Sequence, residues 1–96
     1  MQQLRFNGDI TLEQVFSEYR TEIYDNLVKA IRENLEEELD QVTVLVVGIN
    51  SIDYTVNLTK DKFESSLKSA ISYYEKLELY EKCEECLDLL NKLKNN

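Results

Sequence analysis

The fold of this chain is decided by the stretch Val42-Thr43-Val44-Leu45-Val46-Val47, then Gly48-Ile49-Asn50-Ser51, then Ile52-Asp53-Tyr54-Thr55-Val56-Asn57-Leu58. β-Branched and aromatic residues dominate the two outer runs, and the middle run is typical of a turn. The pattern predicts a β-hairpin with strands at 42–47 and 52–58. A hairpin alone is at best marginally stable, so we expect a third strand, either from residues 2–6 of this chain or from a partner.

The two predicted strands differ in how apolar residues alternate along them. In the second strand, apolar side chains occupy every other position, which is typical of a strand with one face in water. In the first strand, Leu45 and Val47 alternate with Val44 and Val46, so both faces are apolar. We therefore expect this strand to be covered on both faces or paired on both edges, with Leu45 and Val47 marking a contact surface.

Residues 11–39 predict one long helix. Thr11 followed by Gln14 matches the capping box, in which two side chains satisfy backbone groups at a helix start. Apolar residues then recur every three or four positions, as one helix face requires; they are Leu12, Phe16, Tyr19, Ile23, Leu27, Ile31, Leu35 and Leu39. At about 1.5 Å per residue such a helix is roughly 40 Å long, so we expect it to bend or to project.

A helical hairpin is predicted after the second strand, with Thr59 as the N-cap of its first helix. Ala70 to Cys83 (AISYYEKLELYEKC), together with the later leucines of 87–93, resembles one tetratricopeptide-type helical hairpin, in which this stretch spans the turn. The resemblance covers about a third of the chain in one copy, and it implies a helix-turn-helix. The expected fold is therefore α+β, a single domain over residues 1–96 with a long N-terminal helix, a β-hairpin and a C-terminal helical hairpin.

Composition and charge limit the classes of partner. The chain has 96 residues and a net charge of −8, which repels nucleic acid phosphates and anionic membranes and favours a basic protein partner. It has no apolar run near the roughly 20 residues that a membrane span needs, and no signal peptide core. Two cysteines are too few for a disulfide scaffold. We expect a cytoplasmic protein.

An acidic cluster stands out at the end of the predicted long helix. Glu33, Glu36, Glu37 and Asp40 are spaced to share one helix face, where they repel one another and oppose the helix dipole. The cluster can be a solvated surface, a binding site for a basic protein surface, a mimic of nucleic acid phosphates, or a site for a divalent cation. A calcium-binding EF-hand loop is absent from the sequence.

Cys83 and Cys86 are the most motif-like pair in the chain. With no His and no other Cys, one chain cannot complete a zinc site, although two protomers can pool four thiolates. The acidic flanks oppose a redox role, and the helical spacing with neighbouring leucines favours two small core residues. Tyr73 is a separate candidate: it adjoins Tyr74 on a helix, and since both cannot face one core, we expect Tyr73 at a neighbouring element or a partner.

The function predicted from these features is a small acidic protein–protein interaction module, an adaptor or inhibitor of a larger complex, acting without a cofactor or catalysis. No His is present, and Gly8 and Gly48 are isolated, so neither triad chemistry nor a phosphate loop is indicated. The predicted partner-binding residues are Glu33, Glu36, Glu37, Asp40, Leu45, Val47 and Tyr73. One alternative is a phage-type inhibitor that mimics nucleic acid and acts on a host defence or transcription complex; the Asn, Lys, Glu and Ile-rich composition suits a low-GC microbe or its phage. The other is a homo-oligomeric structural component such as a homodimer.

Overall fold

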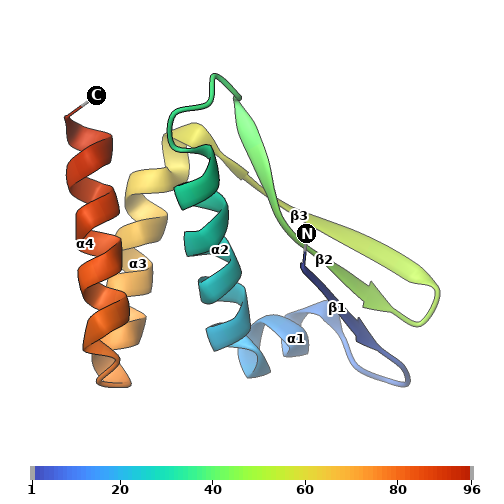
Figure 1. Cartoon of the computed structure of the whole chain (residues 1–96). Helices are drawn as coiled ribbons and strands as arrows, with labels where there is room; N and C mark the ends of the chain where they lie inside the picture. The colour runs from blue at the N-terminus through green and yellow to red at the C-terminus, as the bar shows by residue number, and fades with distance from the viewer. Residues whose placement is uncertain (1, 96) are drawn as a thin grey trace.

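Over the residues that the structure describes, the chain folds into a three-stranded mixed sheet and four α-helices, an α+β arrangement (Figure 1). The computed structural model describes residues 2–95. In chain order the elements are β1 (Gln2–Phe6), α1 (Leu12–Glu18), α2 (Arg20–Asn34), β2 (Gln41–Ile49), β3 (Ile52–Thr59), the 3₁₀ helix η1 (Lys60–Lys62), α3 (Phe63–Lys76) and α4 (Tyr80–Lys94). None of the helices described is both long and apolar enough to cross a lipid bilayer.

The predicted hairpin and its third strand are both present. The strand order is β1-β2-β3, with β1 parallel and β3 antiparallel to β2. The third strand therefore comes from this chain, over residues 2–6, which was one of the two sources expected for it. Asn50, in the hairpin turn, donates its backbone N–H to the carbonyl of Phe6 at 2.8 Å, and its side chain bonds Gly8 in both directions. These bonds hold the hairpin tip to the end of β1.

β2 is apolar at consecutive positions because it contains a β-bulge. Its register with β3 slips by one residue between Thr43 and Leu45. An extra residue reverses the phase of side-chain alternation, so Leu45 and Val47 face the same side as Val44. All three are buried in one core cluster. The prediction that β2 is paired on both edges is confirmed, whereas the prediction that Leu45 and Val47 lie on the face opposite Val44 is wrong.

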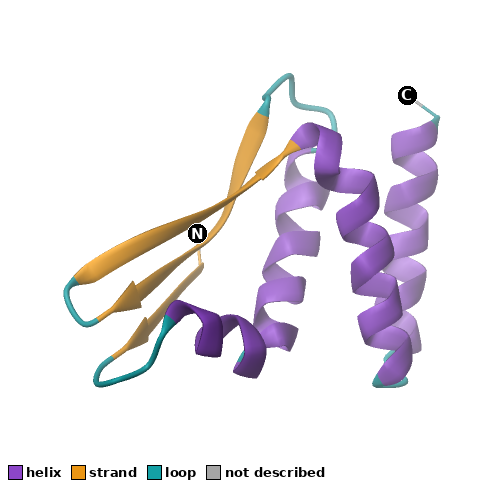
Figure 2. Ribbon diagram, turned by 180° about the vertical axis from the view of Figure 1, so that it is seen from behind, coloured by secondary structure: helices purple, strands orange, loops and turns teal. Residues whose placement is uncertain are grey.

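The single helix predicted over residues 11–39 is wrong in two places, although its capping box at Thr11 and Gln14 is confirmed. Tyr19 leaves the helical conformation (φ −116°, ψ 37°) and packs its ring on Phe6 with 4.9 Å between centroids. This contact lets α1 turn under the sheet while α2 packs on β2 (Figure 2). The helix then ends at Asn34. Ending there keeps the acids of 36–38 out of a helix whose dipole they would oppose.

The C-terminal helical hairpin is confirmed as α3 and α4, with one correction. Thr59 makes no side-chain cap, because the 3₁₀ helix η1 intervenes and α3 begins at Phe63. α3 lies between α2 and α4, so the three helices form one layer and the sheet projects beside it (Figures 1 and 2). The molecule extends 45 × 33 × 17 Å. Its core joins the buried faces of all three helices to β2.

Candidate functional site

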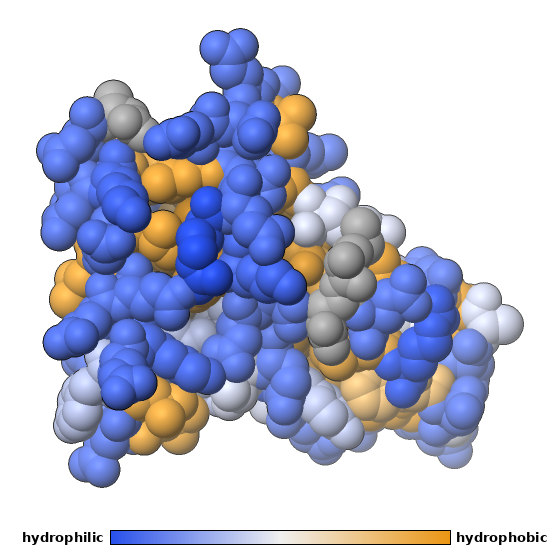
Figure 3. Space-filling view, in the orientation of Figure 1, coloured by the Kyte–Doolittle hydropathy of each residue, from blue (hydrophilic) through white to orange (hydrophobic). Residues whose placement is uncertain are grey.

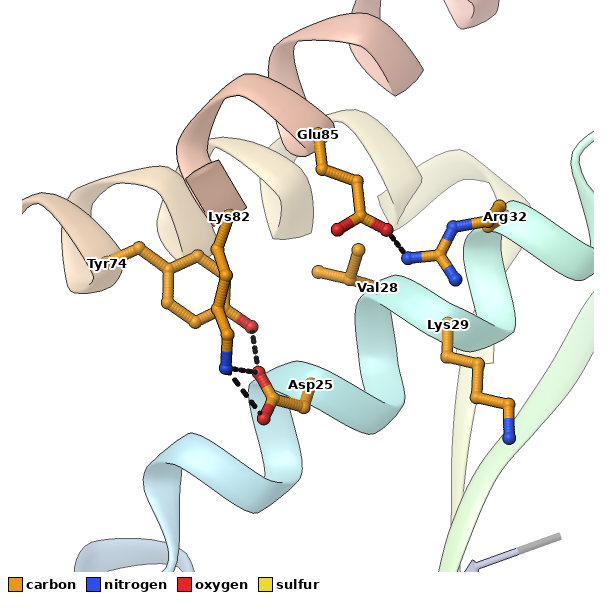
Figure 4. A pocket seen from close by; sticks show the side chains of 7 residues that line it. All are labelled: Asp25, Val28, Lys29, Arg32, Tyr74, Lys82 and Glu85. Carbon is orange, nitrogen blue, oxygen red and sulfur yellow. Dashed lines mark hydrogen bonds and ion pairs between the residues drawn. The ribbon is translucent and has the colours of Figure 1, made fainter. Parts of the chain in front are cut away.

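A polar cluster connects α2 with α4 across α3 (Figure 4). The buried Tyr74 donates its hydroxyl to Oδ1 of Asp25 at 2.6 Å. Lys82, from α4, donates its ammonium to both carboxylate oxygens of Asp25, at 2.9 and 3.0 Å. The same ammonium lies 5.4 Å from the centroid of the Tyr74 ring. Asp25 is thus the acceptor that holds α3 and α4 to α2.

A second ion pair crosses between the same helices one to two turns further along. Arg32 of α2 pairs with Glu85 of α4, and Val28 lies between the two pairs (Figure 4). The hollow lined by this cluster measures about 250 Å³. The space-filling view shows hydrophobic residues between α4 and α2, flanked by hydrophilic ones (Figure 3). Its volume is below the roughly 300–1,000 Å³ typical of small-molecule sites, which favours a structural role for the cluster.

The protonation state of Tyr74 fits that structural role. Burial, and then the hydrogen bond to Asp25, raise the pKa of the Tyr74 hydroxyl well above its usual value. The hydroxyl therefore stays protonated at neutral pH, where it is a hydrogen-bond donor and a poor nucleophile. The Lys82 ammonium is paired with Asp25, so it is not free to promote ionisation of the Tyr74 hydroxyl. The chemistry that this arrangement supports is the fixing of three helices.

The predicted acidic residues do not share a helix face. Glu33 lies in the last turn of α2, while Glu36, Glu37 and Asp40 follow it in the connection to β2. All four are exposed, and none of their carboxylates forms an ion pair with a described side chain. The backbone carbonyls of Glu37 and Asp40 accept hydrogen bonds from Lys60, at 2.7 and 2.9 Å. This acidic loop, residues 36–40, consequently lies beside the end of β3.

The other predicted contact residues, Leu45, Val47 and Tyr73, lie in the core or pack against another helix of the same chain. Leu45 and Val47 have no exposed surface, so the contact surface predicted from them is corrected to part of the core. Tyr73 is half-buried, stacks on Tyr24 with 4.8 Å between centroids, and shares a 2.5 Å hydrogen bond with Thr21. It covers a neighbouring element, α2, which was one of the two places expected for it.

Cys83 and Cys86 are buried free thiols in α4. Burial raises the pKa of both thiols, that of Cys86 to about 11, so almost no thiolate forms at either cysteine at neutral pH. Among the described residues, no group of three or more His, Cys, Asp or Glu side chains could hold a metal ion. The burial of Cys83 and Cys86 agrees with their interpretation as small core residues.

The open edge of β3 is the feature that the sequence reasoning did not single out. In the described chain β3 pairs only with β2, so its other edge is free. Tyr54 and Ile52 pair across from the buried Val47 and Ile49 and so face the core side of the sheet, yet they are 38% and 56% exposed. Leu58 and Val56 are half-buried. The apolar face of β3 thus becomes progressively uncovered toward the hairpin tip.

The sequence carried a signal for this edge but none for the Asp25 cluster. β2 has more apolar positions than β3, which marks β2 as the central strand and leaves β3 at an edge. Asp25 and Lys82 are 57 residues apart, and nothing in their local sequence links them. In comparisons with known proteins, no protein-family model, no curated protein and no solved structure matches the chain.

Proposed function

We propose that this chain is a protein-interaction module that binds an extended, basic segment of a partner along β3, without catalysis and without a cofactor. The observation that carries the proposal is the free, eight-residue edge of β3 with Ile52 and Tyr54 exposed on its apolar face. A free edge offers unpaired N–H and C=O groups, which an added strand can bond. The apolar face then gives contacts for alternate side chains of that strand.

The charge along this edge supports a basic partner. Asp53 is the one ionisable carboxylate or amine within β3, and it is paired with Arg5 at 2.8 Å on the opposite face of the sheet. The acidic loop lies at the other end of β3, next to Lys60. A strand bound along β3 would therefore end beside Glu36, Glu37 and Asp40. Lys or Arg at that end of the segment complements these carboxylates and speeds association.

Net charge supports a partner other than a second copy. Two copies of a chain with net charge −8 repel each other, while a basic segment is attracted. The homodimer remains the alternative that an open edge favours, since two β3 strands can pair antiparallel. The nucleic acid mimic rests on the acidic loop alone, and its exposed carboxylates lack the regular helical spacing expected for them.

The test is selection of random 12-residue segments from a displayed library on the purified wild-type chain. We expect enriched sequences that alternate apolar and polar residues and carry Lys or Arg toward one end. Amide exchange in the complex should slow at the N–H groups of β3 that point to the free edge. Replacing Ile52 and Tyr54 together by Lys should weaken binding at least about tenfold, because burying two such side chains is worth a few kcal/mol.

A matched control is the pair Tyr80→Lys and Leu87→Lys on α4. These side chains are 62% and 50% exposed, and α4 lies on the far side of the helical layer from the hairpin (Figure 1). The control adds the same charge and removes similar apolar surface, so its affinity should match wild type. Equal losses in both variants, protected amides outside β3, or a pure wild-type chain that dimerises through β3 at micromolar concentration would each overturn the proposal.

A further inference from the structure

A second hollow, of about 420 Å³, lies between the first turns of α2 and the last turns of α3. The two helices are antiparallel, so these segments meet at the same end of the molecule (Figures 1 and 2). The hollow is larger than the one around Asp25 and falls within the range of small-molecule sites. It lies on residues that neither the β3 edge nor the Asp25 cluster uses.

The charge of this hollow is opposite to that of the chain. Acids outnumber basic residues 19 to 11, yet the charged residues that line it are Arg20 and Lys76, with no carboxylate. The four other hollows described on the surface each include at least one Asp or Glu. Neither Arg20 nor Lys76 forms an ion pair with any side chain that the structure describes.

Helix electrostatics explain one of these cations but not the other. Lys76 is in the last turn of α3, where a positive charge stabilises the helix dipole. Arg20 is the first residue of α2, where a positive charge opposes the dipole, and Tyr19 provides no side-chain cap. A local rule broken without a compensating contact is typical of a functional position. Because Arg20 is exposed and has no ion-pair partner among the described side chains, its guanidinium is available to a ligand.

The walls of the hollow are already held in place. Tyr73 and Tyr24 stack with 26° between their planes, and the Tyr73 hydroxyl is fixed by Thr21. The two rings and the two cations line the same hollow, and the rings, held by these contacts, have little rotamer entropy to lose on binding. Ser69 and Ser72 add hydroxyls three residues apart on one face of α3.

We propose that this hollow binds a small organic anion, a phosphate monoester or carboxylate carried on a flat aromatic body. Arg20 donates a forked pair of hydrogen bonds to two oxygens of the anion, and Lys76 adds a point charge. The serine hydroxyls donate to the remaining oxygens, and the aromatic body lies against the tyrosine rings. The site is independent of the β3 edge, so neither proposal depends on the other.

The test is a titration of the full ¹⁵N-labelled chain, followed by amide chemical shifts, with phenyl phosphate, benzoate, inorganic phosphate and phenol as separate probes. We expect saturable shifts with phenyl phosphate, benzoate or both, confined to residues 20–24 and 69–77. Affinity should be at least about tenfold higher than for inorganic phosphate or phenol, because each of these lacks half of the recognised group. Comparing phenyl phosphate with benzoate decides which anion the site prefers.

Arg20→Gln and Lys76→Gln should each weaken binding about fivefold or more, as expected for a lost charge-assisted hydrogen bond. The matched control is Lys68→Gln, which removes an exposed lysine of α3 that does not line the hollow and should leave affinity unchanged. All three are surface substitutions, which rarely unfold a protein, and circular dichroism verifies the fold. Absence of saturable shifts at millimolar probe, shifts centred elsewhere, or equal loss in Lys68→Gln would overturn the proposal.

Discussion

Tyr73 and Tyr74 are neighbours in sequence with different surroundings. Both rings contact Tyr24 of α2, at 4.8 and 6.3 Å between centroids. The Tyr74 side chain is buried against Asp25, while that of Tyr73 reaches the half-buried hydroxyl of Thr21. Adjacent residues on a helix point about 100° apart, so this pair contacts α2 at two points along its length. The Tyr74 hydroxyl makes its hydrogen bond at the edge of the core, and the Tyr73 hydroxyl makes its bond at the wall of the hollow that Arg20 lines.

Replacing Tyr74 by Phe should lower the free energy of unfolding by about 1–2 kcal/mol at neutral pH. The change removes a hydrogen bond to a carboxylate and leaves no buried donor unpaired, while Asp25 keeps Lys82. Urea unfolding measures the loss. Tyr80→Phe is the control, because Tyr80 is 62% exposed and should give no change. A wild-type value for Tyr74→Phe would show that water replaces the bond at no cost.

The same residue makes stability depend on pH at the alkaline end. The folded pKa of Tyr74 is raised above the unfolded value of about 10, so the unfolded state loses this proton first. Its contribution is fully present below pH 10 and is lost as the pH rises toward the folded pKa. The stability difference between wild type and Tyr74→Phe should therefore shrink above pH 10. A difference that stays constant to higher pH would contradict the assigned hydrogen bond.

At the scale of elements, the turn between α3 and α4 shows why one boundary was hard to place from sequence. The N–H of Leu79 bonds the carbonyl of Tyr74 at 2.9 Å, and that of Glu78 bonds Glu75 at 3.0 Å. This pair of bonds is the Schellman motif, which ends many helices with a glycine at positive φ. Here Glu78 occupies that position, at φ 59°. The helix therefore ends without the residue that usually marks its end.

Glu78→Gly should raise the free energy of unfolding by about 0.5–1 kcal/mol. Glycine removes the clash of Cβ in the left-handed conformation, worth about 1–2 kcal/mol, and part of this gain is offset by greater freedom of the unfolded chain. The control is Glu81→Gly, in the first turn of α4, which should lower stability by up to about 1 kcal/mol. Thermal unfolding measures both; a loss of stability in both variants would show that Glu78 is not strained.

What the sequence could predict follows from the range of the interactions. The hairpin and the Thr11 capping box depend on neighbouring residues, and both are confirmed. The alternation of Leu4 and Phe6 indicated a strand at residues 2–6, but its pairing with the distant β2 left a partner's strand as the alternative until the structure decided between them. The break at Tyr19 depends on its contact with Phe6, and the apolar period runs through the break without change. The bulge near Val44 likewise depends on how β2 pairs. The Asp25 cluster joins three helices, so no local pattern indicated it.

At the scale of the whole molecule, the shape and the charge both support binding at the sheet. The radius of gyration is 14.0 Å, against about 12.5 Å expected for a compact domain of this length. The excess reflects a hairpin that extends past the helical layer, so that part of its apolar face is uncovered (Figure 1). The acidic loop stands at the other end of β3. Exposed apolar side chains therefore lie at one end of β3, and the exposed carboxylates of the acidic loop lie at the other.

Reversing Glu36 and Glu37 to Lys should weaken binding of a basic segment and raise stability at low salt by about 0.5–1 kcal/mol. The carboxylates have no ion-pair partners among the described residues, and they stand just past the negative end of α2. The net charge falls from −8 to about −4, which also reduces self-repulsion. Thermal unfolding at low and high salt should show a gain that shrinks as salt screens it.

The pair Glu81→Lys and Glu84→Lys separates the local effect from the global one, because it makes the same change in net charge within the first two turns of α4. Acids there are favourable to the helix dipole, so this control should gain little or lose stability, and binding along β3 should be unaffected. Equal gains in both pairs would assign the effect to overall repulsion. A loss of stability in Glu36→Lys/Glu37→Lys would mean that the acidic loop contributes to the fold, and intact binding would remove it from the partner site.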